Sequence, residues 1–244
     1  KGMKMSKSKG NALDPLPIIE KFGADTFRFW SASEVNHGSD FRCSEQKIDS
    51  TKKFLTKLWN VSRFLSSFPI IESAELADTD KWIISELDKL VKDCKVGFDQ
   101  YNFFIPATAI REFTWNVFAA QYIEMAKTRA YGIEFSDAER DGAIYTLHKV
   151  LSTLLKLLAP ITPYITDFLW QTLYSDKSIH TEQQAKEESN EDLTQHTQAI
   201  SDFNSKVWNE KKEKGLSLKD SIKIEIPKEL EIFKKDLVAM HHLE

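Results

Sequence analysis

Hydrophobic side chains recur every three or four residues over much of this chain, the spacing that gathers them on one face of an α-helix. The clearest run begins after Ser44, whose hydroxyl can cap a first turn, and extends to about residue 67. We therefore predict a helix over residues 44–67 that turns one stripe toward a core. The stripe consists of Phe54, Leu58, Val61, Leu65 and Phe68.

Further helices are predicted by the same spacing and by the prolines and glycines at their ends. Pro106 and Pro163 suit a first turn, which needs no amide donor. The helix that begins at Pro106 has two hydrophobic stripes, so we expect it in the centre of a bundle. Two short helices that meet at Gly23 should precede the bundle. The predicted ranges are 14–23, 24–33, 79–101, 106–131, 136–159 and 163–174.

The last part of the chain is more polar than the rest. Residues 175–192 have the composition of a solvated acidic loop, and a polar helix should follow them up to Gly215. Ile222, Ile224 and Ile226 alternate with charged residues, which predicts a β-strand. The predicted fold is therefore mainly α. It divides into a loop with short helices (1–43), a helical bundle (44–176) and a small α/β appendage (177–244).

The net charge of −4 hides a division along the chain. Residues 1–67 hold 12 Lys and Arg against 7 Asp and Glu, whereas the remaining residues hold 21 against 30. This balance argues against a protein that grips nucleic acid over its whole surface. A polyanionic partner should instead be drawn to the first third of the chain.

Cysteine content and hydropathy argue against several classes of protein. Cys43 and Cys94 stand far apart, without histidines at metal-ligand spacing, so neither a disulfide framework nor a metal site is predicted. There is no long hydrophobic run and no charged-then-apolar leader, which favours a soluble cytoplasmic protein without a membrane partner. Lys1 is not an initiator residue, and we expect the chain to be a piece of a longer protein.

Three lysines and two serines gather within residues 4–9. A short segment of this kind can offer ammonium and hydroxyl groups to a polyphosphate, and lysine suits the task as a compact charge on a flexible stem. Attack of a carboxylate on the α-phosphate of ATP builds negative charge that such lysines can follow. Taken by itself, however, such a run is more often a solvated basic tail.

The wider sequence decides between these two interpretations. Residues 4–8 resemble the KMSKS signature of class I aminoacyl-tRNA synthetases, and residues 11–15 and 22–29 look like the segments that follow this loop in the valine, isoleucine and leucine enzymes. The resemblance implies that Lys7 contacts ATP with Lys4 assisting, while Lys9 is optional. Mg²⁺ would accompany ATP in the intact enzyme. The residues assigned to ATP binding are Lys4, Met5, Ser6, Lys7 and Ser8, of which Lys4 and Lys7 are the catalytic pair.

Residues 57–64 indicate which members of this family the chain resembles. Lys57-Leu58-Trp59-Asn60, followed by Arg63-Phe64, is similar to the start of the anticodon-binding domain in the valyl members of the family, with the isoleucyl members as the alternative. The intact protein would then activate valine with ATP and transfer it to tRNA. The nucleotide-binding fold and the editing domain of such enzymes have no counterpart in this sequence, so we expect no activity and no tightly bound cofactor from this chain alone. A helical tRNA-binding module without catalysis is the other hypothesis.

The predicted helix over 44–67 has a second stripe, about a quarter turn from the hydrophobic one. A phenylalanine lies there among basic and amide side chains, an arrangement that suits an unpaired base and its phosphates. A wide hydrophobic arc that includes Phe64 is the structural alternative. The resemblance favours contact with the anticodon arm of tRNA and no role in DNA binding. The stripe consists of Gln46, Lys53, Lys57, Asn60 and Phe64.

Several other conspicuous residues are interpreted as structural. His148 lies among leucines and valine, where a packed core histidine is more common than a ligand or a base. Trp82, Trp115 and Trp170 occur at helical spacing and are expected in the core of the bundle.

Overall fold

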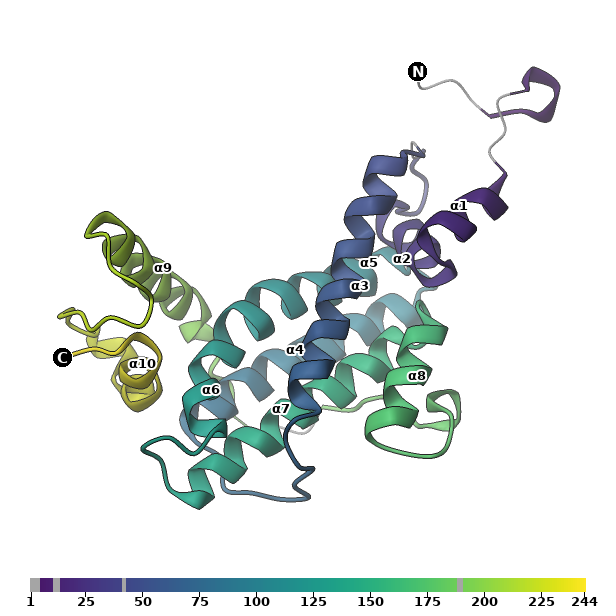
Figure 1. Ribbon diagram of the computed structural model, residues 1–244. Coiled ribbons are helices and arrows are strands. Elements are labelled where there is room, and N and C mark those ends of the chain that lie inside the picture. The colour runs from purple at the N-terminus through teal and green to yellow at the C-terminus, as the bar shows by residue number, and fades with distance from the viewer. Residues whose placement is uncertain (1–4, 11–13, 41–42, 188–190) are drawn as a thin grey trace.

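The computed structural model describes residues 5–10, 14–40, 43–187 and 191–244, and their regular structure is helical (Figure 1). None of the helices in these ranges has the length and hydrophobicity that a bilayer-spanning helix needs. The α-helices are α1 (Pro15–Phe22), α2 (Ala24–Glu34), α3 (Glu45–Leu65), α4 (Asp78–Asp99), α5 (Phe104–Glu112), α6 (Ile123–Ala130), α7 (Asp137–Leu158), α8 (Pro163–Leu173), α9 (Thr197–Glu213) and α10 (Lys234–His241). A π-helical segment, η2 (Phe113–Tyr122), joins α5 to α6, and short 3₁₀ turns cover Lys7–Lys9, Ile179–Thr181, Thr194–His196 and Lys228–Phe233.

The helix ends follow from local chemistry that the sequence already contains. Asp14 caps α1 by accepting a hydrogen bond from the amide of Leu16 at 3.0 Å. Gly23 ends the same helix with φ of 89°, a conformation that costs a residue without a β-carbon little. Ser136 and Glu139 form a capping box at the start of α7, in which each side chain accepts from the backbone amide of the other.

The bundle is built from α3, α4, α7 and the continuous run from α5 through η2 to α6. That run lies in the centre, as predicted from its two hydrophobic stripes: Ile110, Phe118, Tyr122 and Met125 are fully buried. The prediction for His148 is also confirmed. It is buried, and its ring nitrogens lie 3.1 Å from the Tyr174 hydroxyl and 3.3 Å from the Phe68 carbonyl oxygen.

Trp82 and Trp170 are buried as predicted, but the prediction for Trp115 is wrong, because 40% of this side chain is exposed. The difference follows from η2. A π-helical turn holds more residues than an α-helical turn, so a stripe spaced for 3.6 residues per turn does not stay on one face of it. Phe118 and Tyr122 therefore face the core while Trp115 reaches the surface.

Two side chains on α2 dock the N-terminal helices onto the turn between α7 and α8. The Arg28 guanidinium donates to the carbonyl oxygens of Ile161 (2.9 Å) and Pro160 (3.1 Å). The Asp25 carboxylate accepts from the amides of Ile165 (2.6 Å) and Tyr164 (3.4 Å), in the first turn of α8. Burial raises the pKa of Asp25, and these amide hydrogen bonds oppose the shift. A carboxylate at a helix N-terminus is favourably placed, so the contact fixes α2 against the bundle.

The strand predicted over residues 222–226 is wrong, and within the described residues the appendage is helical rather than α/β. A single bridge joins Ile222 to the end of the chain: its amide donates to the His242 carbonyl oxygen, and its own carbonyl oxygen accepts from the amide of Glu244, each at 3.2 Å. The residues after Ile222 are extended without further ladder bonds. Ile222, Ile224 and Ile226 pack on the core while Lys223 and Glu225 are exposed, so a strand-like alternation arises without a sheet.

A buried polar chain joins this C-terminal part to the centre of the bundle. His241 on α10 lies 2.7 Å, through Nε2, from Oδ1 of Asn204 on α9, and the Asn204 amide donates to Gln121 in η2 at 2.7 Å. The Lys211 ammonium donates to the carbonyl oxygen of His241 at 2.8 Å. Burial first, and then the nearby charge of Lys211, lower the pKa of His241 to about 4.

Acid should weaken the fold through His241. Its folded-state pKa of about 4 lies below the ~6.5 of an unfolded histidine, so between these values the unfolded chain binds more protons. The corresponding stability is fully present above pH 6.5 and is lost as pH falls toward 4. From pH 7 to pH 5 urea unfolding should show a loss of about 2 kcal/mol from this group. His241→Gln, whose amide N–H replaces the imidazole N–H as a donor to Asn204, should flatten this slope, and an unchanged slope would contradict the assignment.

Candidate nucleic-acid interface

The lysine-rich loop lies at one tip of the molecule, beyond α1 (Figure 1). Its backbone makes one 3₁₀ turn over Lys7–Lys9, closed by a hydrogen bond from the Lys9 amide to the Ser6 carbonyl oxygen at 3.2 Å. The hydroxyls of Ser6 and Ser8 lie 2.7 Å apart, and Met5 and Ser8 are exposed. Lys4 and the side chain of Lys7 lie outside the described residues. The turn thus brings both serine hydroxyls of the motif together at an exposed tip.

The five residues predicted to face RNA share one edge of α3. Gln46, Lys53 and Asn60 are exposed, whereas Lys57 and Phe64 are half-buried. Gln46 and Phe64 are 18 residues apart, which corresponds to about 27 Å along a helix axis. The edge is therefore long enough to follow several nucleotides, and the aromatic ring lies at its half-buried end.

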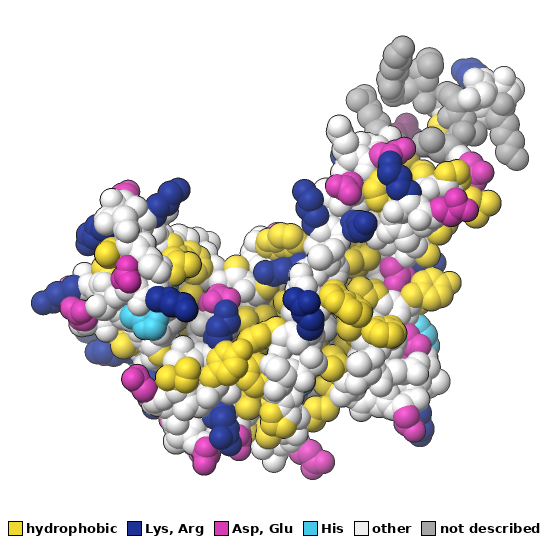
Figure 2. Space-filling view, viewed as in Figure 1, with side chains coloured by type: hydrophobic (Ala, Val, Ile, Leu, Met, Phe, Trp, Pro, Cys, Tyr) yellow, Lys and Arg dark blue, Asp and Glu magenta, His cyan; other side chains and the backbone are white. Residues whose placement is uncertain are grey.

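Three residues from η2 and the end of α6 face this edge, and no pattern along the chain assigns them to it. The Lys57 ammonium lies 5.9 Å from the centroid of the Trp115 ring, and the Lys127 ammonium lies 5.8 Å from that of Phe64. Tyr131, which is 55% exposed, meets Phe64 edge-on at 6.4 Å between centroids. Hydrophobic and basic side chains lie next to one another on the face that α3 shares with α6 (Figure 2). Periodicity within one helix cannot reveal such pairs between helices.

Both lysines lie near an aromatic face, an arrangement in which the ring quadrupole attracts the cation. The Lys127 ammonium is also held by the Glu124 carboxylate at 2.7 and 2.8 Å. Rings flanked by ammonium groups can stack on bases while the charges meet phosphates, which is how single-stranded nucleic acid is commonly bound.

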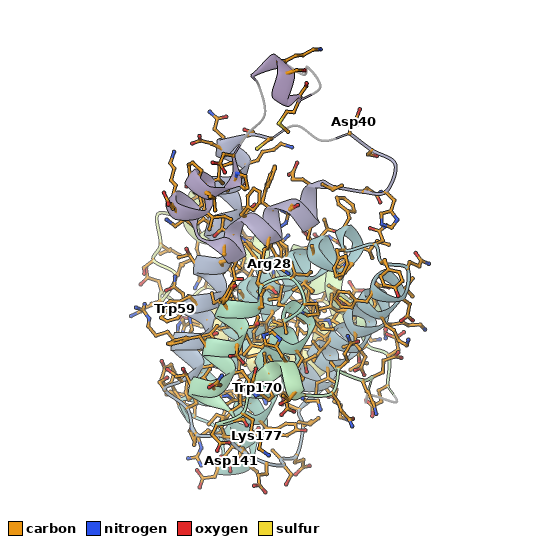
Figure 3. The ribbon with its side chains drawn as sticks, turned by 90° about the vertical axis from the view of Figure 1, so that its right-hand side faces the viewer. Arg28, Asp40, Trp59, Asp141, Trp170 and Lys177 are labelled. Carbon is orange, nitrogen blue, oxygen red and sulfur yellow. The ribbon has the colours of Figure 1, made fainter. Side chains whose placement is uncertain are left out.

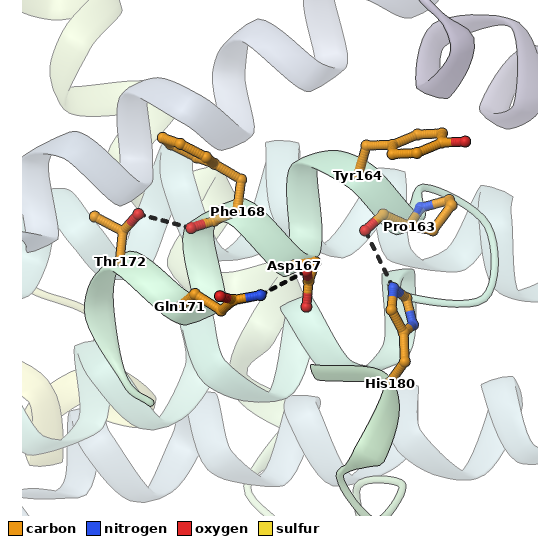
Figure 4. A pocket seen from close by; sticks show the side chains of 7 residues that line it. All are labelled: Pro163, Tyr164, Asp167, Phe168, Gln171, Thr172 and His180. Carbon is orange, nitrogen blue, oxygen red and sulfur yellow. Dashed lines mark hydrogen bonds between the residues drawn. The ribbon is translucent and has the colours of Figure 1, made fainter. Parts of the chain in front are cut away.

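The opposite edge of α3 has a different character. Trp59 lies there, stacked on Phe168 of α8 with ring centroids 5.7 Å apart, whereas Trp170 of the same helix is buried (Figure 3). Beside this pair is an open depression of about 610 Å³, which α8 and His180 line (Figure 4). Its carboxylate, Asp167, already accepts hydrogen bonds from Gln171, Ser178 and the Ile179 amide. That carboxylate is engaged within the protein and is poorly placed to act as a base.

Neither a reactive thiol at Cys94 nor a metal site is indicated among the described residues. Burial raises the pKa of the Cys94 thiol to about 12, so it stays protonated at neutral pH. Across the described ranges, no three His, Cys, Asp or Glu side chains are grouped as a metal ion would require. Among the described residues, the edge of α3 and the exposed turn of the lysine-rich loop have the side-chain chemistry that suits a polyanionic ligand.

Comparison with protein families gives two matches, which leave residues 45–79, with α3, and residues 227–244 outside both. Residues 80–226 match the family described as the anticodon-binding domain of tRNA ligase, and residues 1–44 match the family of class I tRNA synthetases for I, L, M and V. The first match includes the Trp115 side of the edge and most of the bundle. The second includes the lysine-rich loop, α1 and α2.

Curated relatives and solved structures point the same way. The chain is 38% identical to the valine–tRNA ligase of Nanoarchaeum equitans over 100% of its length, and 40% identical to that of Pyrobaculum aerophilum over 91%. It spans only 32% and 28% of those two proteins, about a third of their length. Among solved structures, a LeuRS from Agrobacterium radiobacter in a ternary complex with tRNA and LeuAMS has a similar fold. The alignment covers 76% of this chain and 22% of the LeuRS chain, with a TM-score of 0.61 and 21% identity. The methionyl-tRNA synthetase of Mycobacterium tuberculosis with methionyl-adenylate aligns over 70% of the chain and 36% of its own, with a TM-score of 0.61 and 22% identity, so both show the fold alone.

Proposed function

Because the chain belongs to the anticodon-binding domain family of tRNA ligases, we propose that it is the part of a valine–tRNA ligase that binds the anticodon arm of its tRNA and carries the KMSKS loop. The observation that carries the proposal is the match to valine–tRNA ligases over the whole chain. The aromatic and basic edge of α3 supports it independently, since such an edge suits unpaired bases.

The choice of valine over isoleucine is supported by the two relatives described above, because both are valine–tRNA ligases. The choice of an enzyme fragment over a separate tRNA-binding module is supported by their length, about three times that of the chain, and by the class I synthetase match over residues 1–44. We place the intact protein in the cytoplasm, where translation consumes aminoacyl-tRNA.

The KMSKS loop is assigned to ATP. Lys4 and Lys7 would neutralise charge on the phosphates while valine attacks the α-phosphate, and Met5, Ser6 and Ser8 would line the nucleotide. Mg²⁺ would accompany ATP in the intact enzyme and spread the charge of its phosphates. The chain alone should show no aminoacylation, since the valine pocket and the remainder of the nucleotide site would lie in the other two thirds of the protein.

Binding of the anticodon stem–loop of a valine tRNA to this chain tests the proposal. Phe64→Ala should weaken binding by about 1–3 kcal/mol, the range for base–aromatic stacking. Lys57→Ala should instead flatten the dependence of affinity on salt concentration, because a phosphate contact releases counterions when it forms. Filter binding across a salt series measures both effects.

Melting temperatures measured beside these affinities separate an RNA contact from a packing role. Phe64 is half-buried against Phe68 and Tyr131, so its removal should also cost some stability. A Phe64→Ala variant that melts earlier but binds RNA like the original chain would contradict the assignment of this edge.

A further inference from the structure

Trp115 is a large aromatic side chain that the hydrophobic pattern places in the core and the structure places at the surface, 40% exposed. A single exposed tryptophan is ordinary. What distinguishes this one is the ammonium of Lys57, which lies 5.9 Å from the centroid of its ring. The pair combines a flat, accessible π-surface with a positive charge at the same point of the α3 edge.

Phe64 and Lys127 form a second pair of the same kind further along the edge, with 5.8 Å between the ammonium and the ring centroid. The two pairs are in line because Lys57 and Phe64 both belong to α3. They are seven residues apart, which is two turns and about 10.5 Å of helix rise. Stacked bases are only about 3.4 Å apart. Two ring–lysine pairs that are anchored two turns apart on α3 suit bases that have been splayed out of a continuous stack, as the unpaired bases of an RNA loop can be.

We propose that Trp115 is a second base-stacking platform for unpaired nucleotides of the anticodon loop, separate from Phe64 and serving a different nucleotide. Lys57, which shares α3 with Phe64 and whose ammonium lies beside the Trp115 ring, then contacts the phosphate backbone that joins the two nucleotides. Lys127 contributes less, because Glu124 already takes up part of its hydrogen-bonding capacity. This inference rests on the proposed function, that the chain binds the anticodon arm of a tRNA.

The molecule offers a matched control. Trp59 is 41% exposed, almost the same fraction as Trp115, and its ring stacks on Phe168 of α8. It lies on the opposite edge of α3, against Phe168, away from the two ring–lysine pairs. Trp59→Ala and Trp115→Ala thus remove identical side chains of nearly equal exposure, from edges that the proposal treats differently.

The experiment is equilibrium binding of the anticodon stem–loop of a valine tRNA to the chain and its variants. Trp115→Ala should weaken binding roughly 5- to 150-fold, the change that corresponds to one base–aromatic stack. Trp115→Phe should retain most of the affinity, since any aromatic face can stack. Trp59→Ala should bind like the original chain.

Tryptophan fluorescence in the same titrations gives a second readout. It should be quenched on binding, and Trp115→Phe should remove most of that quenching. This readout uses the aromatic replacement, so it does not depend on whether the alanine variant folds.

Abasic substitutions in the RNA test the two-platform arrangement. Removing one loop base should abolish the effect of Trp115→Ala while leaving that of Phe64→Ala, and removing another should do the reverse. If Phe64→Ala weakens binding but Trp115→Ala does not, the second platform is wrong and the proposed function stands. If both variants bind normally, the proposed function itself fails. Equal losses for Trp59→Ala and Trp115→Ala would also overturn the second platform, since they would indicate a general effect of removing a surface ring.

Discussion

Replacing Arg129 by methionine should lower the free energy of unfolding by about 3–5 kcal/mol, the usual effect of removing one partner from a buried ion pair. The guanidinium is almost completely buried and binds the Asp80 carboxylate through two parallel hydrogen bonds of 2.6 and 2.7 Å. Its Nε donates to Asp236 at 3.2 Å. Methionine fills a similar volume but leaves both carboxylates buried without a counter-charge.

The effect should be large because Arg129 is the charge at the centre of a hydrogen-bond network that joins four segments. Asp80 belongs to α4, Arg129 to α6 and Asp236 to α10, and Tyr122 of η2 donates its hydroxyl to Asp80 at 2.6 Å. Burial and the adjacent Asp80 carboxylate raise the pKa of Tyr122, which therefore remains a donor at neutral pH. The C-terminal helix is thus attached to the bundle at the place where the π-helical segment ends.

Urea unfolding of the variant measures the loss, and Arg140→Met provides its control. Arg140 pairs with Asp137 and Asp141 at the surface, where ion pairs are screened by solvent, so its replacement should leave the unfolding midpoint nearly unchanged. Arg129→Lys should not restore stability, because an ammonium cannot reproduce the two parallel hydrogen bonds. An Arg129→Met variant as stable as Arg140→Met would show that the buried network contributes little.

The parts of the fold that depend on one segment at a time could be predicted from the sequence. Helix α3 lies where the stripe from Phe54 to Leu65 placed it, and Gly23 separates two short helices as expected. The stripe from Gln46 to Phe64 could likewise be recognised, because positions on one helix are fixed relative to one another. In these cases hydrophobic periodicity and capping residues are sufficient to predict where a helix lies and which side chains share one of its faces.

What depends on contact between segments could not be predicted in the same way. The shift to π-helical geometry in η2 turns Trp115 outward, and no spacing rule for α-helices anticipates it. The alternation at Ile222 and its neighbours reflects packing of an extended segment on the core, which has the same period as a strand in a sheet. Asp25 and Arg28 belong to the segment 22–29, and its resemblance to a family segment says nothing of their contacts. Their hydrogen bonds to a turn more than 130 residues later explain what these residues do in the fold.

Lys7→Ala should slow formation of the valyl-adenylate roughly a hundredfold or more in the full-length enzyme of which we propose this chain is a part. A charge that acts mainly on the transition state affects the rate more than the binding of the ground state. Affinity for tRNA should stay almost unchanged, because that binding is assigned to the edge of α3. Lys9→Ala, a change in the same loop, should reduce the rate far less if the role belongs to Lys7 and not to basic charge in general. Pyrophosphate exchange measures the activation step alone, and exchange by Lys7→Ala near the original rate would contradict the role assigned to this lysine.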